Sequence, residues 1–133
     1  MVHQITMQRL GPRRIFFVAG AQKSGTTWLQ RLLSGLPGIW CCGEGHFADK
    51  LVAPFAQVVR DYNQCLTVVE ERVFEGSGEG FLPITQAEFD EYCRLIIETR
   101  LLAKVPKEIL AIGDKTPANA LHLDTLHRLY PGA

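Results

Sequence analysis

A short apolar strand that runs into a glycine-containing loop and then into a helix is the feature that most restricts the fold of this chain. Residues 14–19 read Arg-Ile-Phe-Phe-Val-Ala, and such an apolar, aromatic and β-branched run predicts a buried strand. From Thr26 the apolar residues recur at helical spacing, and the pattern stops at Gly35 and Pro37. A strand, a loop and a helix in this order are typical of α/β domains.

The rest of the chain continues the alternation of strands and helices. The expected elements are a strand at 39–41, helical structure over about 47–74 with a break near Asn63, a loop at 75–80, a helix at 85–103, a strand at 109–113 and a final helix from Pro117. Thr85 and Glu88 form a capping box at the start of the helix at 85–103. The final helix is expected to turn four residues inward, Leu123, Leu126, Leu129 and Tyr130. We therefore predict an α/β fold with a mainly parallel sheet flanked by helices.

Charge and composition exclude several classes of protein. The 133 residues carry 14 basic and 14 acidic side chains, which argues against a non-specific nucleic-acid binder or a polybasic membrane protein. No apolar run is long enough for a membrane span, and no cleavage pattern follows the first one. The four cysteines lack metal-ligand spacing, so we expect no metal, reduced thiols and a cytoplasmic location.

The basic residues are unevenly distributed along the sequence. Residues 1–40 contain five basic residues and no acidic residue, and the rest of the chain has nine basic and fourteen acidic ones. This asymmetry predicts an anionic partner near the first third of the chain, although a chance cluster of solvated arginines would give the same pattern.

The loop between the first strand and the first helix has the composition of an anion site. The free amides at a helix N-terminus attract phosphate or sulfate, Lys23 adds a full charge, and Gly25 allows close approach of the backbone. The loop is not the P-loop of nucleoside triphosphatases, because Thr26 stands where that motif has its lysine. The alternative interpretation is an ordinary tight turn with a surface lysine.

Three segments together resemble the sulfotransferases, which use 3′-phosphoadenosine 5′-phosphosulfate (PAPS). Residues 23–29, Lys-Ser-Gly-Thr-Thr-Trp-Leu, resemble their 5′-phosphosulfate-binding loop. Residues 44–47, Glu-Gly-His-Phe, are similar to the Glu-x-His-Phe segment of the heparan-sulfate-type and related bacterial members. Residues 114–117, Asp-Lys-Thr-Pro, and the turn at 130–133 are similar to two later segments of the family. The resemblance runs from residue 14 to the end of the chain.

The resemblance implies a role for each matched residue. The donor PAPS would be held without a metal by Gln22, Lys23, Ser24, Gly25, Thr26 and Thr27. Lys23 would stabilise the charge that grows on the departing 5′-phosphate. Glu44 would be the base that takes the proton of a hydroxyl or amine on a small-molecule or carbohydrate acceptor. His46 could be the base instead or could orient the substrate, Glu44 could be a solvated turn residue, and Trp28 is expected to pack rather than to bind adenine. Lys115 is expected to bind an acidic acceptor or to pair with Asp114.

The resemblance also implies that the domain is incomplete. In the family, a further strand and helix carry an Arg and a Ser that bind the 3′-phosphate, and this sequence stops at Ala133. We expect residues 1–133 to be the N-terminal part of a single P-loop-like domain, inactive or impaired alone and prone to self-association through a sheet edge. Two alternatives stay open. One is a P-loop nucleotide kinase, in which Asp114 after an apolar strand would bind Mg²⁺. The other is a non-catalytic partial domain.

Overall fold

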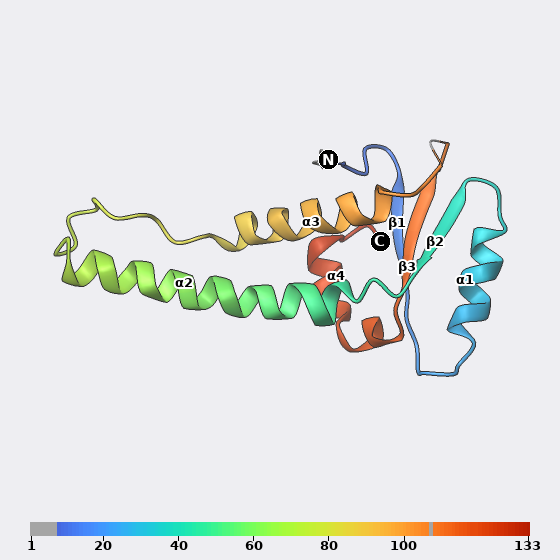
Figure 1. The fold of residues 1–133 in the computed structure, drawn as a ribbon, viewed down its shortest axis with the longest axis horizontal. Helices are drawn as coiled ribbons and strands as arrows, with labels where there is room; N and C mark the ends of the chain where they lie inside the picture. Colours follow the sequence, from blue (N-terminus) through green and yellow to red (C-terminus); the bar gives the residue numbers. More distant parts are fainter. Residues whose placement is uncertain (1–7, 107) are drawn as a thin grey trace, which may run out of the picture.

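The computed structural model describes residues 8–106 and 108–133 and confirms an α/β fold (Figure 1). Its elements are β1 (Arg14–Val18), α1 (Thr26–Ser34), β2 (Ile39–Gly43), a π-helical segment η1 (Phe47–Val52), α2 (Ala53–Arg72), α3 (Gln86–Leu102), β3 (Ala111–Lys115), a 3-10 helix η2 (Pro117–Leu121) and α4 (Leu123–Leu129). No helix in the described ranges has both the length and the apolar character needed to cross a bilayer.

The three strands form a parallel sheet in the order β1-β3-β2, with β3 in the centre. Strand β3 includes Asp114 and Lys115, so it begins and ends two residues later than the sequence predicts. Gly113 faces Phe16 of β1 across the register, and any Cβ at this position would overlap the Phe16 ring. The central strand therefore needs a glycine where the neighbouring ring covers it.

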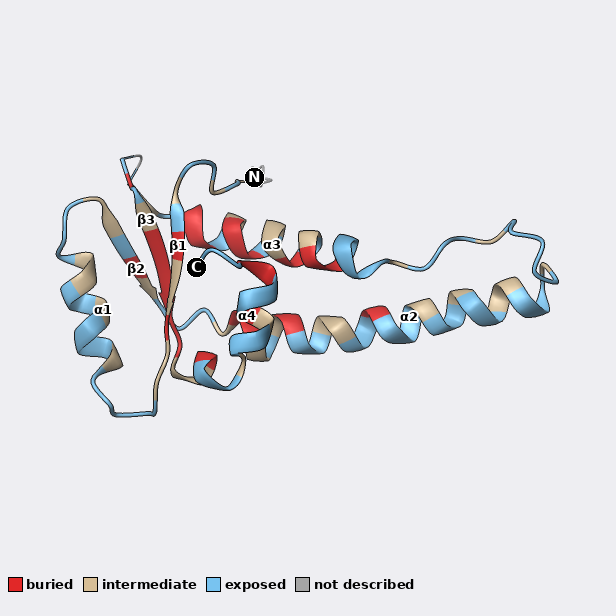
Figure 2. Ribbon diagram, turned by 180° about the vertical axis from the view of Figure 1, so that it is seen from behind, coloured by how far each residue is buried: buried red, intermediate tan, exposed pale blue. Residues whose placement is uncertain are grey.

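Helices lie on both sides of the sheet, and the main core lies on the side of α3 and α4 (Figure 1). Ile97 of α3, Ile112 of β3 and Leu129 of α4 are at most 1% exposed and belong to one cluster of buried side chains. Figure 2 shows the same distribution, with buried residues concentrated on β3, α3 and α4. Of the four residues expected inward on the final helix, three are buried, but Leu123 is 59% exposed.

Helix α1 contacts the sheet through polar groups and leaves most of its apolar side chains exposed. Ser34 Oγ accepts from the Cys41 amide at 3.1 Å, and Gln30 Nε2 donates to the Cys41 carbonyl at 3.2 Å. Trp28 is 68% and Leu32 50% exposed, and α1 has no buried residue. Trp28 is therefore not a core residue, because α1 turns its polar side toward β2.

Helix α2 extends from the sheet and runs without interruption through Asn63, so the expected break is absent (Figure 1). The Asn63 amide instead holds the segment that returns toward α3. Its Nδ2 donates to the Ile84 carbonyl and its Oδ1 accepts from the Ile84 amide, both at 2.8 Å. The predicted capping box is confirmed, since Thr85 caps α3 and Glu88 bonds back to the Thr85 amide.

Candidate functional site

The loop that follows β1 is exposed to solvent and leads directly into the N-terminus of α1. Lys23 and Gly25 both have a positive φ, 62° and 89°, and Gly25 is the residue before the helix begins. The Ser24 hydroxyl donates to the Ala21 carbonyl at 2.6 Å, so it closes the loop on itself. Among the described residues, no side chain caps α1 and no acidic residue lies in its first turn. The N-terminus of α1 therefore keeps its partial positive charge available to an anion.

A cavity of about 280 Å³ at this edge of the sheet gathers most of the predicted site residues. Seven of the nine predicted residues line it, and Ser24 and Gly25, which shape the loop, do not. The lining comprises Gln22, Lys23, Thr26, Thr27, Glu44, His46, Lys115, Pro117 and Ala118. One lysine of the loop, two threonine hydroxyls and a second lysine thus face a carboxylate and an imidazole.

Strand register explains why residues far apart in sequence meet in this cavity. Val18 and Gly43 both pair with Lys115, so all three strands end at the same level. The loop with Lys23 follows β1, Glu44 follows β2, and Lys115 is the last residue of β3. The carboxyl ends of parallel strands are the usual place for a ligand site in an open α/β sheet.

Glu44 and Lys115 form an ion pair across the cavity. Lys115 Nζ donates to Glu44 Oε1 at 2.7 Å, and the Lys115 side chain is only 4% exposed while that of Glu44 is 51% exposed. The hydrogen bond and the charge of Lys115 lower the pKa of the Glu44 carboxyl. Lys115 therefore pairs with Glu44, and the expected pairing of Lys115 with Asp114 is wrong.

His46 lies between two carboxylates. Its Nδ1 is 3.0 Å from Asp49 Oδ2, and its Nε2 is 3.5 Å from Glu44 Oε2. The hydrogen bond with Asp49, followed by the charges of Asp49 and Glu44, raises the pKa of His46. Asp49 was missed by sequence reasoning, and its only signal is the His-x-x-Asp spacing, which places two side chains on one helical turn.

Asp114 of β3 is wholly buried, and both oxygens of its carboxylate accept hydrogen bonds from other protein groups. Its carboxylate accepts from the Gly45 amide, the Thr116 hydroxyl and the Asn119 side-chain amide. A carboxylate that binds Mg²⁺ needs free oxygens that face the ligand. The observation that favoured a nucleotide kinase therefore has a different explanation in the fold.

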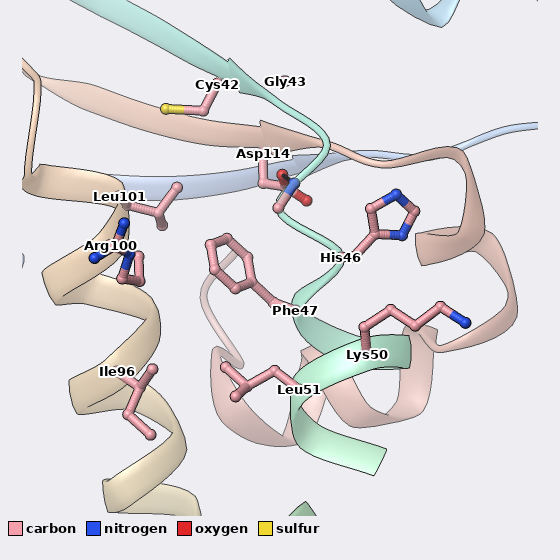
Figure 3. A pocket seen from close by; sticks show the side chains of 11 residues that line it. Cys42, Gly43, His46, Phe47, Lys50, Leu51, Ile96, Arg100, Leu101 and Asp114 are labelled. Atoms are coloured by element: carbon pink, nitrogen blue, oxygen red, sulfur yellow. Dashed lines mark hydrogen bonds between the residues drawn. The ribbon is translucent and has the colours of Figure 1, made fainter. Parts of the chain in front are cut away.

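A second cavity of about 510 Å³ lies beside the first, between η1 and α3 (Figure 3). His46 lines both cavities. The other side chains around the second cavity are the apolar Phe47, Leu51, Ile96 and Leu101, the cations Lys50 and Arg100, the thiol of Cys42 and the carboxylate of Asp114. The imidazole thus lies between a polar cavity with two lysines and a larger cavity with mainly apolar walls.

The charge asymmetry of the sequence has a mixed origin. Arg9 pairs with Glu91 and Glu98 of α3 and so anchors the chain ahead of β1. Of the five basic residues in the first 40, Lys23 alone lines the 280 Å³ cavity, and the second lysine there is Lys115. Structural ion pairing thus accounts for part of the excess of basic residues, and the anionic partner that this excess predicts stays a prediction.

Within residues 8–106 and 108–133 no group of three or more His, Cys, Asp or Glu side chains has the arrangement of a metal site.

Comparison with known proteins agrees with the resemblance inferred from the loop. A putative protein-tyrosine sulfotransferase of Caenorhabditis briggsae is 29% identical over 120 residues, which are 90% of this chain and 37% of that protein. The chain thus spans 37% of the length of this curated relative. A family model described as "Sulfotransferase family" matches residues 15–133, and the chain belongs to this family.

Proposed function

We propose that this chain carries the donor end and the catalytic base of a PAPS-dependent sulfotransferase. The observation that carries the proposal is the 280 Å³ cavity, in which Lys23, Thr26 and Thr27 face Glu44 and His46. Because the chain spans only part of its curated relative, the activity of the whole protein is included in this proposal.

The donor side of the cavity fits a tetrahedral oxyanion. Lys23 offers a charged donor, Thr26 and Thr27 offer hydroxyls, and the amides of α1 offer the partial charge of a helix N-terminus. PAPS supplies an activated sulfuryl group attached to its 5′-phosphate. Lys23 is suited to neutralise the charge that develops on this phosphate as the sulfuryl group leaves.

Glu44 is the group that we assign as the base. The Lys115 ammonium keeps its carboxyl ionised at neutral pH and fixes one of its two oxygens. An acceptor hydroxyl or amine that attacks sulfur must lose a proton, and an ionised carboxylate at the mouth of the cavity can take it. His46, held by Asp49, lies within 3.5 Å of the other Glu44 oxygen and restrains that side of the carboxylate.

The larger cavity is the place for the acceptor. It adjoins the donor cavity at His46, so a molecule seated there extends toward Glu44. We expect an acceptor hydroxyl or amine on a small molecule or carbohydrate. The name of the similar Caenorhabditis briggsae protein adds a tyrosine hydroxyl in a protein to the acceptors that should be tested.

Calorimetric titration with adenosine 3′,5′-bisphosphate tests the donor assignment. Lys23→Ala removes a charge-assisted bond to phosphate, for which about 1.5–3 kcal/mol is usual, so affinity should fall at least about tenfold. Arg31→Ala is the matched control, because Arg31 is an exposed cation of α1 that does not line the cavity. Equal losses in the two variants would contradict a specific role for Lys23.

Transfer of a radiolabelled sulfuryl group from PAPS to a panel of alcohols, amines, sugars and a tyrosine peptide tests the reaction itself. Glu44→Gln should abolish transfer and leave bisphosphate affinity unchanged. Preference for ATP with Mg²⁺, with activity lost on chelation, would overturn the proposal in favour of a phosphotransferase.

A further inference from the structure

We infer that Asp114 is a positioning residue that fixes the turn carrying Glu44 and His46. The inference rests on the proposed function, because it concerns how the base and its neighbouring imidazole are held. Figure 3 shows Asp114 at the end of β3, where it points toward the segment that leads to His46.

The turn at residues 44–46 has a backbone that does not hold itself in place. Glu44 and His46 both have a positive φ, 40° and 50°, although neither is a glycine. Non-glycine residues in this region are strained, and they persist where the surrounding structure determines their conformation. Some other part of the molecule must therefore hold the turn.

The end of β3 provides this support by accepting a hydrogen bond from each of three consecutive amides. The Glu44 amide donates to the Lys115 carbonyl at 2.7 Å. The Gly45 amide donates to Asp114 Oδ1 at 2.7 Å, and the His46 amide donates to Thr116 Oγ1 at 3.2 Å. Two of these three acceptors depend on side chains, so the sequence at 114–116 determines whether the turn is held.

Asp114 also orients the hydroxyl that accepts from His46. Thr116 Oγ1 donates its own proton to Asp114 Oδ2 at 2.8 Å, which leaves the oxygen lone pairs free for the His46 amide. Asn119 Nδ2 donates to the same Asp114 oxygen at 3.1 Å. Asp114 and Thr116 are 0% exposed and Asn119 is 1% exposed, so water cannot replace a lost partner without rearrangement.

This arrangement requires a side chain with a hydrogen-bond acceptor at both the Oδ1 and the Oδ2 position. Three donors converge on the two oxygens of Asp114. Asn at this position would place an NH₂ group against either the Gly45 amide or the Thr116 hydroxyl, and one buried donor would then lack a partner. Asp114→Asn is therefore a nearly isosteric change that should loosen the turn.

Hydrogen exchange of individual amides, followed by NMR on the whole chain, tests the inference. In Asp114→Asn we expect exchange at Gly45 and His46 to be at least tenfold faster, while amides of α3 keep their wild-type protection. Asp90→Asn is the matched control, because Asp90 is also a buried carboxylate but bonds Arg128 and Gln86 away from the turn. Unchanged exchange at Gly45 and His46 in Asp114→Asn, or the same acceleration in Asp90→Asn, would overturn the inference.

A second pair of variants covers the case in which Asp114→Asn does not fold. Thr116→Val removes the hydroxyl at nearly constant volume, and Thr116→Ser retains it. We expect accelerated exchange at His46 in the valine variant and rescue in the serine variant. Equal exchange in the two variants would contradict the role of the hydroxyl.

Kinetics separate this inference from the proposed function. In the transfer assay Asp114→Asn should lower kcat about tenfold, with the affinity for adenosine 3′,5′-bisphosphate within twofold of wild type, because the donor loop is held by other contacts. Loss of donor affinity equal to the loss of kcat would contradict a positioning role. If the whole protein transfers no sulfuryl group while the exchange pattern is as expected, the proposed function fails and the anchoring of the turn stands.

Discussion

Gly45 lies against two buried side chains, and its replacement by alanine gives a sharp test of the packing around the turn. An added Cβ would lie 2.5 Å from Phe47 Cε2, 2.7 Å from Phe47 Cζ and 2.9 Å from Asp114 Oδ1. Ordinary contact begins at 3.4 Å, so the ring or the turn must move by about 0.9 Å. Phe47 is 8% exposed and packed in the core, and Asp114 is wholly buried with three partners, so neither can move freely.

The expected cost of Gly45→Ala follows from these constraints. Overpacking in a closed site costs about 1–3 kcal/mol, and a strained Gly45–Asp114 hydrogen bond places this case at the upper end, about 3 kcal/mol. With a urea dependence of about 1.5 kcal/mol per molar, the unfolding midpoint should fall by about 2 M. Circular dichroism in urea measures the midpoint.

A matched control separates the clash from a general effect of removing a glycine. A Cβ added at Gly132 would meet no atom within 4 Å, so Gly132→Ala should change stability by no more than about 0.5 kcal/mol. If Gly45→Ala unfolds at the same urea concentration as wild type, the turn is not packed tightly against Phe47 and Asp114, and the close approach described above is refuted.

Three further predictions concern other parts of the molecule. The hydrogen bond with Asp49 holds the pKa of His46 above its usual value of about 6.5. Protonation of His46 therefore stabilises the fold below that pH, and this stabilisation is lost as pH rises through the folded pKa. Asp49→Asn should lower the imidazole pKa in an NMR titration, and an unchanged pKa would contradict the pairing. Burial raises the pKa of the Cys41 thiol to about 11, so a thiol reagent at pH 8 should label exposed Cys65 well before Cys41, and equal rates would be inconsistent with this burial. Thr85→Ala removes the α3 cap and should cost about 1 kcal/mol in urea unfolding, whereas an unchanged midpoint would show that the cap is dispensable.

Local patterns were sufficient to predict much of the fold. The β1 strand, the loop after it and the capped helix α3 each have short-range signals in periodicity, glycine placement and capping residues. The break expected near Asn63 was wrong because a polar residue in mid-helix was interpreted locally, whereas its amide serves the distant Ile84 backbone. The polar contact of α1 with β2 is likewise a tertiary choice that periodicity does not reveal.

In the candidate site, too, some features could be predicted from the sequence and others depend on tertiary contacts. Parallel strands that end together bring Lys23, Glu44 and Lys115 to one cavity, and sequence order alone gives this arrangement once the sheet is assumed. The partner of Lys115 and the role of Asp49 depend on side-chain directions at the strand ends, which no local pattern encodes. Asp114 looked like a ligand for a cation because an acid after an apolar strand has that appearance, but burial makes it an acceptor for the backbone.

The central place of β3 determines when the site can form. Both β1 and β2 pair only with β3 within the described sheet, and β1 is about one hundred residues away from it in sequence. During synthesis, neither β1 nor β2 has a partner in the described sheet until residues 111–115 leave the ribosome. The donor loop and the turn with Glu44 can therefore reach their final positions only after β3 has been synthesised. Assembly of the cavity and closure of the longest loop in the fold are thus one step, of the non-local kind that makes folding slow.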